Sequence, residues 1–356
     1  MSQIDYAKEL KDLIDIVVAE TGSDIHLSVG THPTVRVMGS LIPLVKKPVL
    51  TNEDVLGFCQ SLMNEGQYEE FQTKREMDFS HSGPDGVRFR GNAYFQKESA
   101  AVALRHIPNK IRTLEELKLP PILESFTTRP QGFFLCVGPV GQGKTTTLAS
   151  LIQIINQTRA DHIITIEDPI EYIYTPDMAL IEQREVRVDT KDFSVALNSV
   201  FRQDVDVILV GEMRNAETIA TAVTAAETGH LVFSTLHTNN AAQTIDRIID
   251  SFPAGQQDQI RTQLAGSLAG IFSQRLIPRI SGGLVPAYEL LINNSAVGNL
   301  IRERRTHEVQ TVIETGLEQG MIDMNRSLTD LVKKGEITVE NAFAYSVNPK
   351  GLERLM

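Results

Sequence analysis

The amino-acid sequence predicts an α/β protein of two domains, a small α+β domain followed by a larger domain built on a parallel sheet. Three observations support this prediction. The chain has 356 residues, which is enough for two domains. In its first part, short strand patterns alternate with helical ones. From Gly132 onward, short and nearly continuous apolar runs alternate with helical segments, which is typical of parallel strands buried on both faces.

The N-terminal segments follow the order helix, strands, helix and strands. We expect a helix at about 5–20 and a helical stretch from Asn52 to about Lys74. Strands are predicted within SDIHLSVG, PTVRVMG, GVRFRGNAYFQ and AAVALRHI, because these runs favour extended backbone and turn residues separate them. The pattern predicts an α+β domain over residues 1–108. The next segment, PNKIRTLEELKLPPI, carries three prolines, and we expect a linker over 109–116.

The second domain is expected over residues 117–356. Its buried strands are predicted within GFFLCVG, HIITIE, VDVILVGE and HLVFSTLH, with helical segments between them. Such alternation implies a parallel sheet with right-handed crossovers. After about Arg279 the pattern becomes mostly helical, so residues 285–356 are expected to form a helical appendage on this domain.

The composition is that of an ordinary globular protein, with 42% hydrophobic and 22% charged residues. The formal net charge of −11 makes direct binding of nucleic acid unfavourable. The two cysteines, Cys59 and Cys136, form no CxxC pair, which favours a reducing cytoplasm over a disulfide or cysteine–zinc framework. No apolar run approaches the ~18 residues of a transmembrane segment, so we expect a soluble protein that reaches a membrane only through partners.

The segment from Gly138 to Thr145 has the pattern G-x-x-x-x-G-K-T between a predicted buried strand and a helical run. Glycines let backbone N–H groups face a phosphate, and the start of a helix adds the positive end of its dipole. Lys144 would reach the β- and γ-phosphates, and Thr145 would bind Mg²⁺. The alternative is a glycine-rich turn that binds nothing. We predict an ATP site formed by Gly138, Pro139, Val140, Gly141, Gln142, Gly143, Lys144, Thr145 and Thr146.

Acidic residues lie at the ends of two other predicted strands. Glu212 follows VDVILVG and is the candidate for polarising the attacking water. The alternative is a strand-end carboxylate that faces solvent. Glu167, Asp168 and Glu171 lie at the end of the strand within HIITIE, where they would repel one another unless a cation or a donor lies among them. We therefore predict that they and Glu212 act through Mg²⁺ or a positioned water, the alternative being an acidic turn.

His237 ends the predicted strand that follows the strand of Glu212 in the sequence. If the two strand ends are neighbours, the imidazole lies near the γ-phosphate and can donate a hydrogen bond to it or to Glu212. The alternative is that Thr238 or Asn239 caps the next helix and His237 only occupies the turn. His230 lies at the other end of the same strand, which favours a role in packing or at a subunit boundary.

In order and spacing, GPVGQGKTTT, TIEDPIEY, RQDVDVILVGEMR and TGHLVFSTLHTNNA resemble the motifs of the secretion ATPase superfamily of type II secretion and type IV pilus systems. The segments GSDIHLSVGTHPTVRVMG, RFRGNAYFQ and IPNKIRTLEEL are similar to its pilus retraction branch, the PilT-like ATPases of twitching motility. The resemblance covers nearly the whole chain. It implies a PAS-like N-terminal domain, a RecA-like P-loop ATPase domain and a hexameric ring.

The resemblance also implies roles for matching residues. Lys144 and Thr145 would bind nucleotide and Mg²⁺, Glu171 and Glu212 would activate water and hold metal, and His237 would sense the γ-phosphate. In this family, arginines from the N-terminal domain of a neighbouring subunit contact the γ-phosphate, where an additional guanidinium stabilises phosphoryl transfer. The matching candidates, which as strand residues could instead face solvent, are Arg88, Arg90, Arg105 and Arg112.

One position departs from the retraction branch, whose C-terminal helix carries an AIR motif. The matching segment here is SAVGNLIRE, with Gly298 in place of the arginine. Glycine inside a helix costs about 1 kcal/mol relative to alanine. ATP hydrolysis is expected to survive this change, whereas the charged contact of the arginine is lost.

The resemblance implies a hexameric ATP-hydrolysing motor that powers type IV pilus retraction by acting on an inner-membrane pilus platform protein. An accessory retraction ATPase is one alternative. Pilus assembly and type II secretion ATPases are others, but they usually carry a four-cysteine zinc element, and this chain has two cysteines. The negative charge disfavours a DNA-handling ATPase. A nucleotide-bound regulatory subunit without turnover is the last alternative, against which Glu212 and His237 argue.

Overall fold

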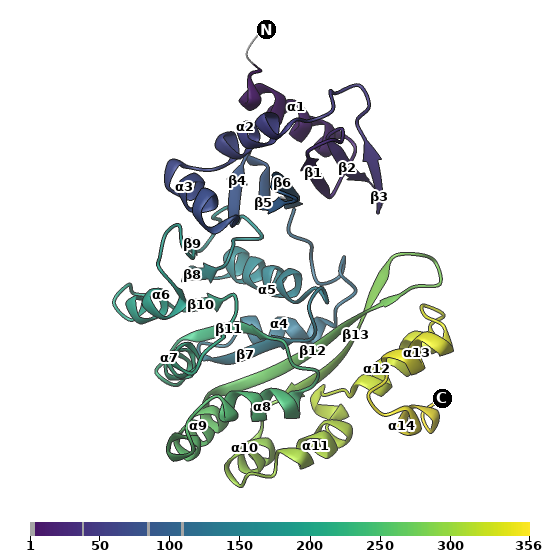
Figure 1. The fold of residues 1–356 in the computed structure, drawn as a ribbon. Helices are drawn as coiled ribbons and strands as arrows, with labels where there is room; N and C mark the ends of the chain where they lie inside the picture. Colours follow the sequence, from purple (N-terminus) through teal and green to yellow (C-terminus); the bar gives the residue numbers. More distant parts are fainter. Residues whose placement is uncertain (1–3, 38, 84–85, 108–109) are drawn as a thin grey trace. The chain divides into compact units, whose positions relative to one another are not determined.

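The computed structural model describes residues 4–37, 39–83, 86–107 and 110–356. The chain divides into two compact units, residues 1–110 with 169–173, and residues 111–168 with 174–356. The predicted boundary between residues 108 and 109 lies outside the described residues. Both units combine helices with a sheet, as the mixed α/β fold predicted from the sequence requires. Each is described by itself below (Figure 1).

The N-terminal unit contains, in the described residues, an antiparallel six-stranded sheet of order β3-β2-β1-β6-β5-β4. The four strands predicted from the sequence correspond to β1, β2, β5 and β6. The elements are α1 (Tyr6–Ala19), β1 (Asp24–Ser28), β2 (Thr34–Val37), β3 (Ser40–Pro43), α2 (Asn52–Leu62), α3 (Glu65–Lys74), β4 (Glu76–Ser82), β5 (Arg88–Gln96) and β6 (Ser99–Ile107).

The helices of this unit begin and end where the sequence supplies caps. α1 starts after Asp5, whose side chain accepts from the N–H of Lys8, and it buries an apolar stripe against the unit's core. The helical stretch expected from Asn52 to Lys74 is two helices. Asn64 and Gln67 form a capping box that starts α3 and therefore separates it from α2.

The second unit contains, in its described residues, a seven-stranded sheet of order β13-β12-β7-β11-β10-β8-β9. All neighbouring strands are parallel except β12 and β13. The predicted strands correspond to β7, β8, β10 and β11. The elements up to the antiparallel pair are α4 (Glu124–Thr127), β7 (Gly132–Val137), α5 (Lys144–Thr158), β8 (His162–Glu167), β9 (Leu180–Glu185), α6 (Phe193–Val200), β10 (Val207–Val210), α7 (Ala216–Glu227), β11 (Leu231–Leu236), α8 (Ala241–Asp250) and α9 (Ala254–Ser267).

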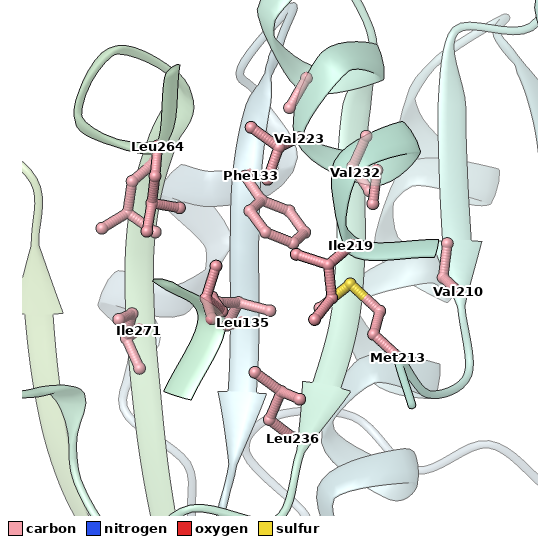
Figure 2. Packing of buried hydrophobic residues seen from close by; sticks show 14 of the residues in the cluster. Phe133, Leu135, Val210, Met213, Ile219, Val223, Val232, Leu236, Leu264 and Ile271 are labelled. Atoms are coloured by element: carbon pink, nitrogen blue, oxygen red, sulfur yellow. The ribbon is translucent and has the colours of Figure 1, made fainter. Parts of the chain in front are cut away.

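This sheet is buried on both faces. On one face, Phe133 and Leu135 of β7 pack with Ile219 of α7 in the cluster shown in Figure 2. On the other face, Phe134 contacts Phe126 of α4, with ring centroids 4.6 Å apart. Successive residues of one strand thus serve opposite layers. That double burial explains why β7 is a continuous apolar run in the sequence.

The sequence pattern predicted a helical appendage over residues 285–356, and this prediction is wrong for its first residues. Its first residues belong to β13, which pairs with β12 along most of its length. Polar residues interrupt the apolar run of β12, which hid this strand pair from the pattern of continuous hydrophobicity. The remaining elements are β12 (Leu268–Pro278), β13 (Leu284–Ile292), α10 (Ser295–Arg302), α11 (Val309–Thr315), α12 (Met324–Lys333), α13 (Val339–Tyr345) and α14 (Pro349–Glu353). Among the helices of the described ranges, none is long and apolar enough to cross a bilayer.

Gly298 lies in the interior of α10, where this helix packs against α9. A Cβ atom built there would lie 3.4 Å from the carbonyl oxygen of Ala265 and 3.6 Å from the guanidinium nitrogens of Arg302. These are ordinary contacts, so the site tolerates a methyl group. The glycine is therefore a local weakness of α10 and not a steric requirement.

We expect Gly298→Ala to raise the free energy of unfolding by about 0.5–1 kcal/mol, because alanine loses less backbone entropy in a helix. Urea unfolding followed by circular dichroism measures the change. Gly320→Ala is the control and should lower the free energy of unfolding, since Gly320 has φ +90° and a Cβ there would collide with Ile122. Equal effects of the two substitutions would contradict this account of Gly298.

Candidate active site at the carboxyl edge of the parallel strands

The strand order brings the predicted chemical groups to one edge of the sheet. β7, β11, β10 and β8 are consecutive and parallel, so their carboxyl ends lie side by side. β7 leads into the P-loop, β11 into His237 and β10 into Glu212, while β8 ends at Glu167. The strands that lead into His237 and Glu212 are neighbours, which meets the condition set in the sequence analysis. β11 lies between the strands of the P-loop and of Glu212.

The P-loop, residues 138–145, folds through backbone conformations that suit glycine. Gly138 has φ +148°, and a Cβ there would lie 2.5 Å from the carbonyl oxygen of Gln274. Gly143 has φ +79° and immediately precedes α5. No side chain of the described residues caps this helix at Gly143, and the start of an α-helix presents N–H groups that can donate to a phosphate.

Lys144 is buried, with 7% of its surface exposed. Its ammonium donates to the carbonyl oxygens of Gly138 at 2.8 Å and Pro139 at 2.9 Å, and lies 3.2 Å from Nδ1 of His237. An ammonium group only donates, so Nδ1 accepts and the ring proton lies on Nε2. The contact joins the P-loop to the end of β11 directly, and it leaves Nε2–H of His237 as a donor.

The imidazole of His237 lies in a strongly charged setting. Loss of hydration and the positive charge of Lys144 lower its pKa, an effect that Glu212 opposes and Arg214 reinforces. The neutral ring is therefore the dominant form at neutral pH. A neutral imidazole can accept from Lys144 and donate to a phosphate oxygen at the same time.

Glu212 is paired with Arg214, a residue that the sequence analysis did not single out. The Glu212 side chain is 20% exposed and that of Arg214 is 65% exposed. The ion pair raises the pKa of Arg214, and Asp168 contributes to this shift. The guanidinium therefore interacts with the carboxylates that follow β8 and β10, and its charge also lowers the pKa of His237 after β11. The motif GEMR could have indicated this ion pair, because an arginine two residues after an acidic residue can reach its carboxylate.

Glu167, the last residue of β8, and Asp168, which follows it, each have a protein partner. Glu167 is buried and accepts from the hydroxyl of Thr165 at 2.6 Å and from the amide of Gln183 at 3.3 Å. Asp168 forms an ion pair with Arg187 at 3.6 Å. Within residues 4–37, 39–83, 86–107 and 110–356, no group of three His, Cys, Asp or Glu side chains could hold a metal ion. Metal binding by Glu167 and Asp168 stays a prediction.

Glu171 lies in the segment 169–173, which groups with the N-terminal unit and not with the sheet that carries the P-loop. Its catalytic and metal-binding roles stay predictions. Arg112 belongs to the second unit, is exposed, and accepts a hydrogen bond from Ser150 at its main-chain oxygen. His230 lies at the opposite end of β11 from His237 and contacts Phe201, with ring centroids 5.6 Å apart, which agrees with the packing role expected of it.

Three candidate arginines share one face of the N-terminal sheet. Arg90 and Arg105 are directly opposite each other on β5 and β6, and Arg88 lies two residues from Arg90 on the same strand. Like charges directly opposite each other repel, so this face favours an anionic partner. Buried Asp24 accepts from Arg105 Nε at 3.1 Å. Burial raises the pKa of Asp24, but hydrogen bonds from Ser23 and Arg105 outweigh this and lower it.

Glu289 of β13 is a second group that sequence analysis missed. It is 1% exposed and accepts a hydrogen bond at 2.8 Å from the N–H of Ala241, at the start of α8. Burial raises the pKa of Glu289 to about 7. The N–H of Ala241 opposes this shift, and the charges of Asp323 and Glu314 add to it. Glu289 therefore holds the start of the helix that follows the loop of His237.

Comparison with known proteins places this geometry in a family. The family described as "Type II/IV secretion system protein" matches residues 87–318. The chain belongs to this family. Among its relatives, "Type IV pilus retractation ATPase PilT" of Pseudomonas aeruginosa is 44% identical over 94% of this chain and 97% of the relative. "Type IV pilus ATPase PilU" of the same organism is 40% identical over 98% of this chain and 91% of the relative.

A solved structure extends the likeness to three dimensions. "Crystal Structure of the Pilus Retraction Motor PilT and Bound ADP" superposes with a TM-score of 0.91 and 46% identity, covering 97% of this chain and 99% of that chain. The resemblance inferred from the motifs, to the pilus retraction branch of the type II/IV secretion ATPase family, is thereby confirmed. The family and the ADP-bound relative support a nucleotide-binding ATPase.

We expect an NMR titration to place the pKa of His237 below its ordinary value of 6.5. Lys144→Ala should raise this pKa by removing a nearby positive charge, while leaving it below 6.5 because the loss of hydration remains. Lys350→Ala, which removes an exposed lysine from α14, is the matched control and should leave the pKa of His237 unchanged. An unchanged pKa in Lys144→Ala would argue against the contact between Lys144 and His237.

Proposed function

We propose that this chain is an ATP-hydrolysing motor that powers type IV pilus retraction, the basis of twitching motility. The observation that carries the proposal is the likeness to the retraction motor over nearly the whole length of both chains. The site geometry supplies the chemical support. A phosphate-binding loop, an imidazole and a carboxylate follow three adjacent parallel strands.

The finer architecture belongs to the same proposal. The N-terminal unit would be PAS-like and the second unit RecA-like, and six copies of the chain would form a ring. The ring would act on an inner-membrane pilus platform protein, without direct contact to nucleic acid. The arginine-bearing face of the N-terminal sheet supports the ring, because Arg90 and Arg105 are exposed there and would meet the nucleotide of a neighbouring subunit.

Hydrolysis would use groups that the structure positions along the strand ends. The P-loop amides and Lys144 would hold the triphosphate, whose oxygens compete with the carbonyls of Gly138 and Pro139 for the ammonium. Glu212 would orient the attacking water. His237 would donate from Nε2 to the γ-phosphate while Nδ1 accepts from Lys144. Binding or loss of the γ-phosphate would thus change the hydrogen bonds of both Lys144 and His237.

The oxygen donors at this edge suit Mg²⁺. The hydroxyl of Thr145, in the first turn of α5, and the carboxylate of Glu212 are ligands of the kind that Mg²⁺ prefers, and phosphate oxygens and waters usually complete its shell. The small number of protein ligands therefore fits a magnesium ion that binds with nucleotide. When bound, the ion would neutralise charge on the β- and γ-phosphates.

One observation favours a second candidate, an accessory retraction ATPase. Gly298 replaces the arginine expected in the C-terminal helix. The match to the relative named "Type IV pilus ATPase PilU" covers 98% of this chain. Pilus assembly and type II secretion ATPases are less well supported, because Cys59 and Cys136 are both buried free cysteines in separate units. Deleting the gene in its host and scoring surface motility and pilus number tests both candidates. A main motor predicts lost motility and excess pili, whereas an accessory motor predicts a partial defect.

We predict that Glu212→Gln reduces kcat for ATP hydrolysis by at least ~100-fold, because glutamine cannot take a proton from water. ATP binding should persist, since glutamine keeps the size of the side chain and its hydrogen bond to Arg214. Steady-state phosphate release and binding of a fluorescent ATP analogue measure the two effects. Glu217→Gln, an exposed acid in the first turn of α7, is the control and should retain full turnover. Wild-type turnover in Glu212→Gln would refute the role.

We predict that two inactive variants restore activity when mixed. Lys144→Ala destroys the phosphate site, and Arg90→Ala together with Arg105→Ala removes the arginines that would act across subunits. In randomly mixed rings, about a quarter of the interfaces would pair an intact P-loop with intact arginines. ATP hydrolysis should therefore reappear in the mixture. Rings shown by native mass spectrometry to be mixed, yet inactive, would mean that these arginines do not act in trans.

A further inference from the structure

We propose that strand β12 positions both the P-loop and the loop of His237, with Gln274 acting on the first and Ser273 and Arg275 acting on the second. The inference rests on the proposed ATPase function and deepens it. It assigns roles to a strand that follows the four ATPase motifs in the sequence and carries none of the predicted catalytic residues. Gln274 is 3% exposed and Ser273 is fully buried, so neither contact depends on solvent-exposed side chains.

Gln274 ties the P-loop to the helix that follows it. Its amide nitrogen donates to the carbonyl oxygen of Gln142 at 2.8 Å, and its amide oxygen accepts from the hydroxyl of Thr147 at 2.6 Å. The N–H of Leu276 donates in turn to the side-chain oxygen of Gln142 at 2.7 Å. Gln142 is therefore held at both its main chain and its side chain. The curvature of the loop between Gly138 and Lys144 depends on a strand that contributes nothing to its sequence motif.

The neighbouring side chains of β12 hold the other loop. The hydroxyl of Ser273 donates to the carbonyl oxygen of Asn239 at 2.8 Å, and the guanidinium of Arg275 donates to the side-chain oxygen of Asn239 at 2.9 Å. Asn239 is two residues from His237. Glu289, the register partner of Ser273, secures the next turn through the N–H of Ala241. Three bonds from β12 and β13 thus restrain residues 239–241.

The alternation of a strand separates the two tasks. Successive side chains of a strand point to opposite faces of the sheet. The side chain of Gln274 therefore lies on one face, and those of Ser273 and Arg275 lie on the other. α5 and the α7–α9 layer cover opposite faces of this sheet, and each loop leads into the helix on its own side (Figure 1). β12 is fixed between β7 and β13 by main-chain hydrogen bonds. Both loops are consequently held by the same strand. The strand therefore helps to set the distance between Lys144 and His237.

Arg275 also borders a cavity of about 390 Å³, which Asn239 lines too. Its Nε is buried and has no hydrogen-bond partner among the described residues. The guanidinium is therefore held by one side only, through Asn239. The contacts of β12 with the His237 loop are therefore weaker than those with the P-loop. Substitution of Ser273 or Arg275 should disturb the loop without unfolding the strand.

The test compares substitutions on the two faces of β12 in the full-length protein. Gln274→Met keeps the length of the side chain and removes both hydrogen bonds, and Thr147→Val removes one of them from the other end. Each should weaken binding of a fluorescent ADP analogue by roughly tenfold. The double variant should bind no more weakly than the worse single variant, because the two substitutions break a shared contact. Thr147→Ser keeps the hydroxyl and is the matched control, with wild-type affinity.

Ser273→Ala and Arg275→Met should show the reverse pattern. ADP affinity should stay within about threefold of wild type, while kcat at saturating ATP falls several-fold because His237 is less well placed. Combined with His237→Ala, neither should lower kcat further. Circular dichroism melting confirms that each variant is folded, and any variant that is not folded is replaced by its partner in the same contact.

The inference is overturned if folded Gln274→Met and Thr147→Val bind ADP like wild type. It is also overturned if substitutions at 273 and 275 change ADP affinity instead of kcat. A wild-type protein that hydrolyses no ATP would instead refute the proposed function. The ADP measurements on residues 274 and 147 would then still decide the part of the inference that concerns the P-loop.

Discussion

The close approach of Gly138 to the carbonyl oxygen of Gln274 is the constraint on which the site depends. A Cβ at position 138 would lie 2.5 Å from that oxygen, so only glycine lets the chain leave β7 against β12 and then turn toward α5. This turn places Lys144 within reach of His237 on the adjacent strand. If the loop were displaced outward, the ammonium would lose its contact with the imidazole, and the start of α5 would no longer face the ends of the other strands.

Electrostatic compensation is the second theme of the site. The chain carries a formal charge of −11, yet the carboxylates at the strand ends are individually matched. Arg214 pairs with Glu212, Arg187 with Asp168, and neutral donors satisfy Glu167. Such pairing allows acidic residues to gather beside a site for a polyanionic ligand, because a cation or a hydrogen-bond donor stabilises each carboxylate before the ligand binds. On the arginine face of the N-terminal sheet, Asp24 accepts from Arg105, and Arg90 is exposed.

The sequence allowed the central strands and the main site residues to be predicted, because these follow local rules. β7, β8, β10 and β11 are apolar runs buried on both faces, and glycine spacing identifies the P-loop. β12 escaped because Ser273, Gln274 and Arg275 interrupt its apolar pattern. The hydrogen-bond partners of those polar residues lie more than thirty positions away in the sequence, and no local pattern encodes such partners. The pairing of Asn64 with Gln67 is local, and it was overlooked within a longer helical pattern.

Glu289 has a consequence for any study of this protein near neutrality. With a pKa of about 7, the carboxyl group is a mixture of two protonation states under ordinary buffer conditions. The peptide N–H that begins α8 therefore meets an acid in some molecules and an anion in others. Preparations studied one unit apart in acidity are chemically different populations. Crystals or spectra obtained on the two sides of neutrality would differ in the charge that faces the start of α8.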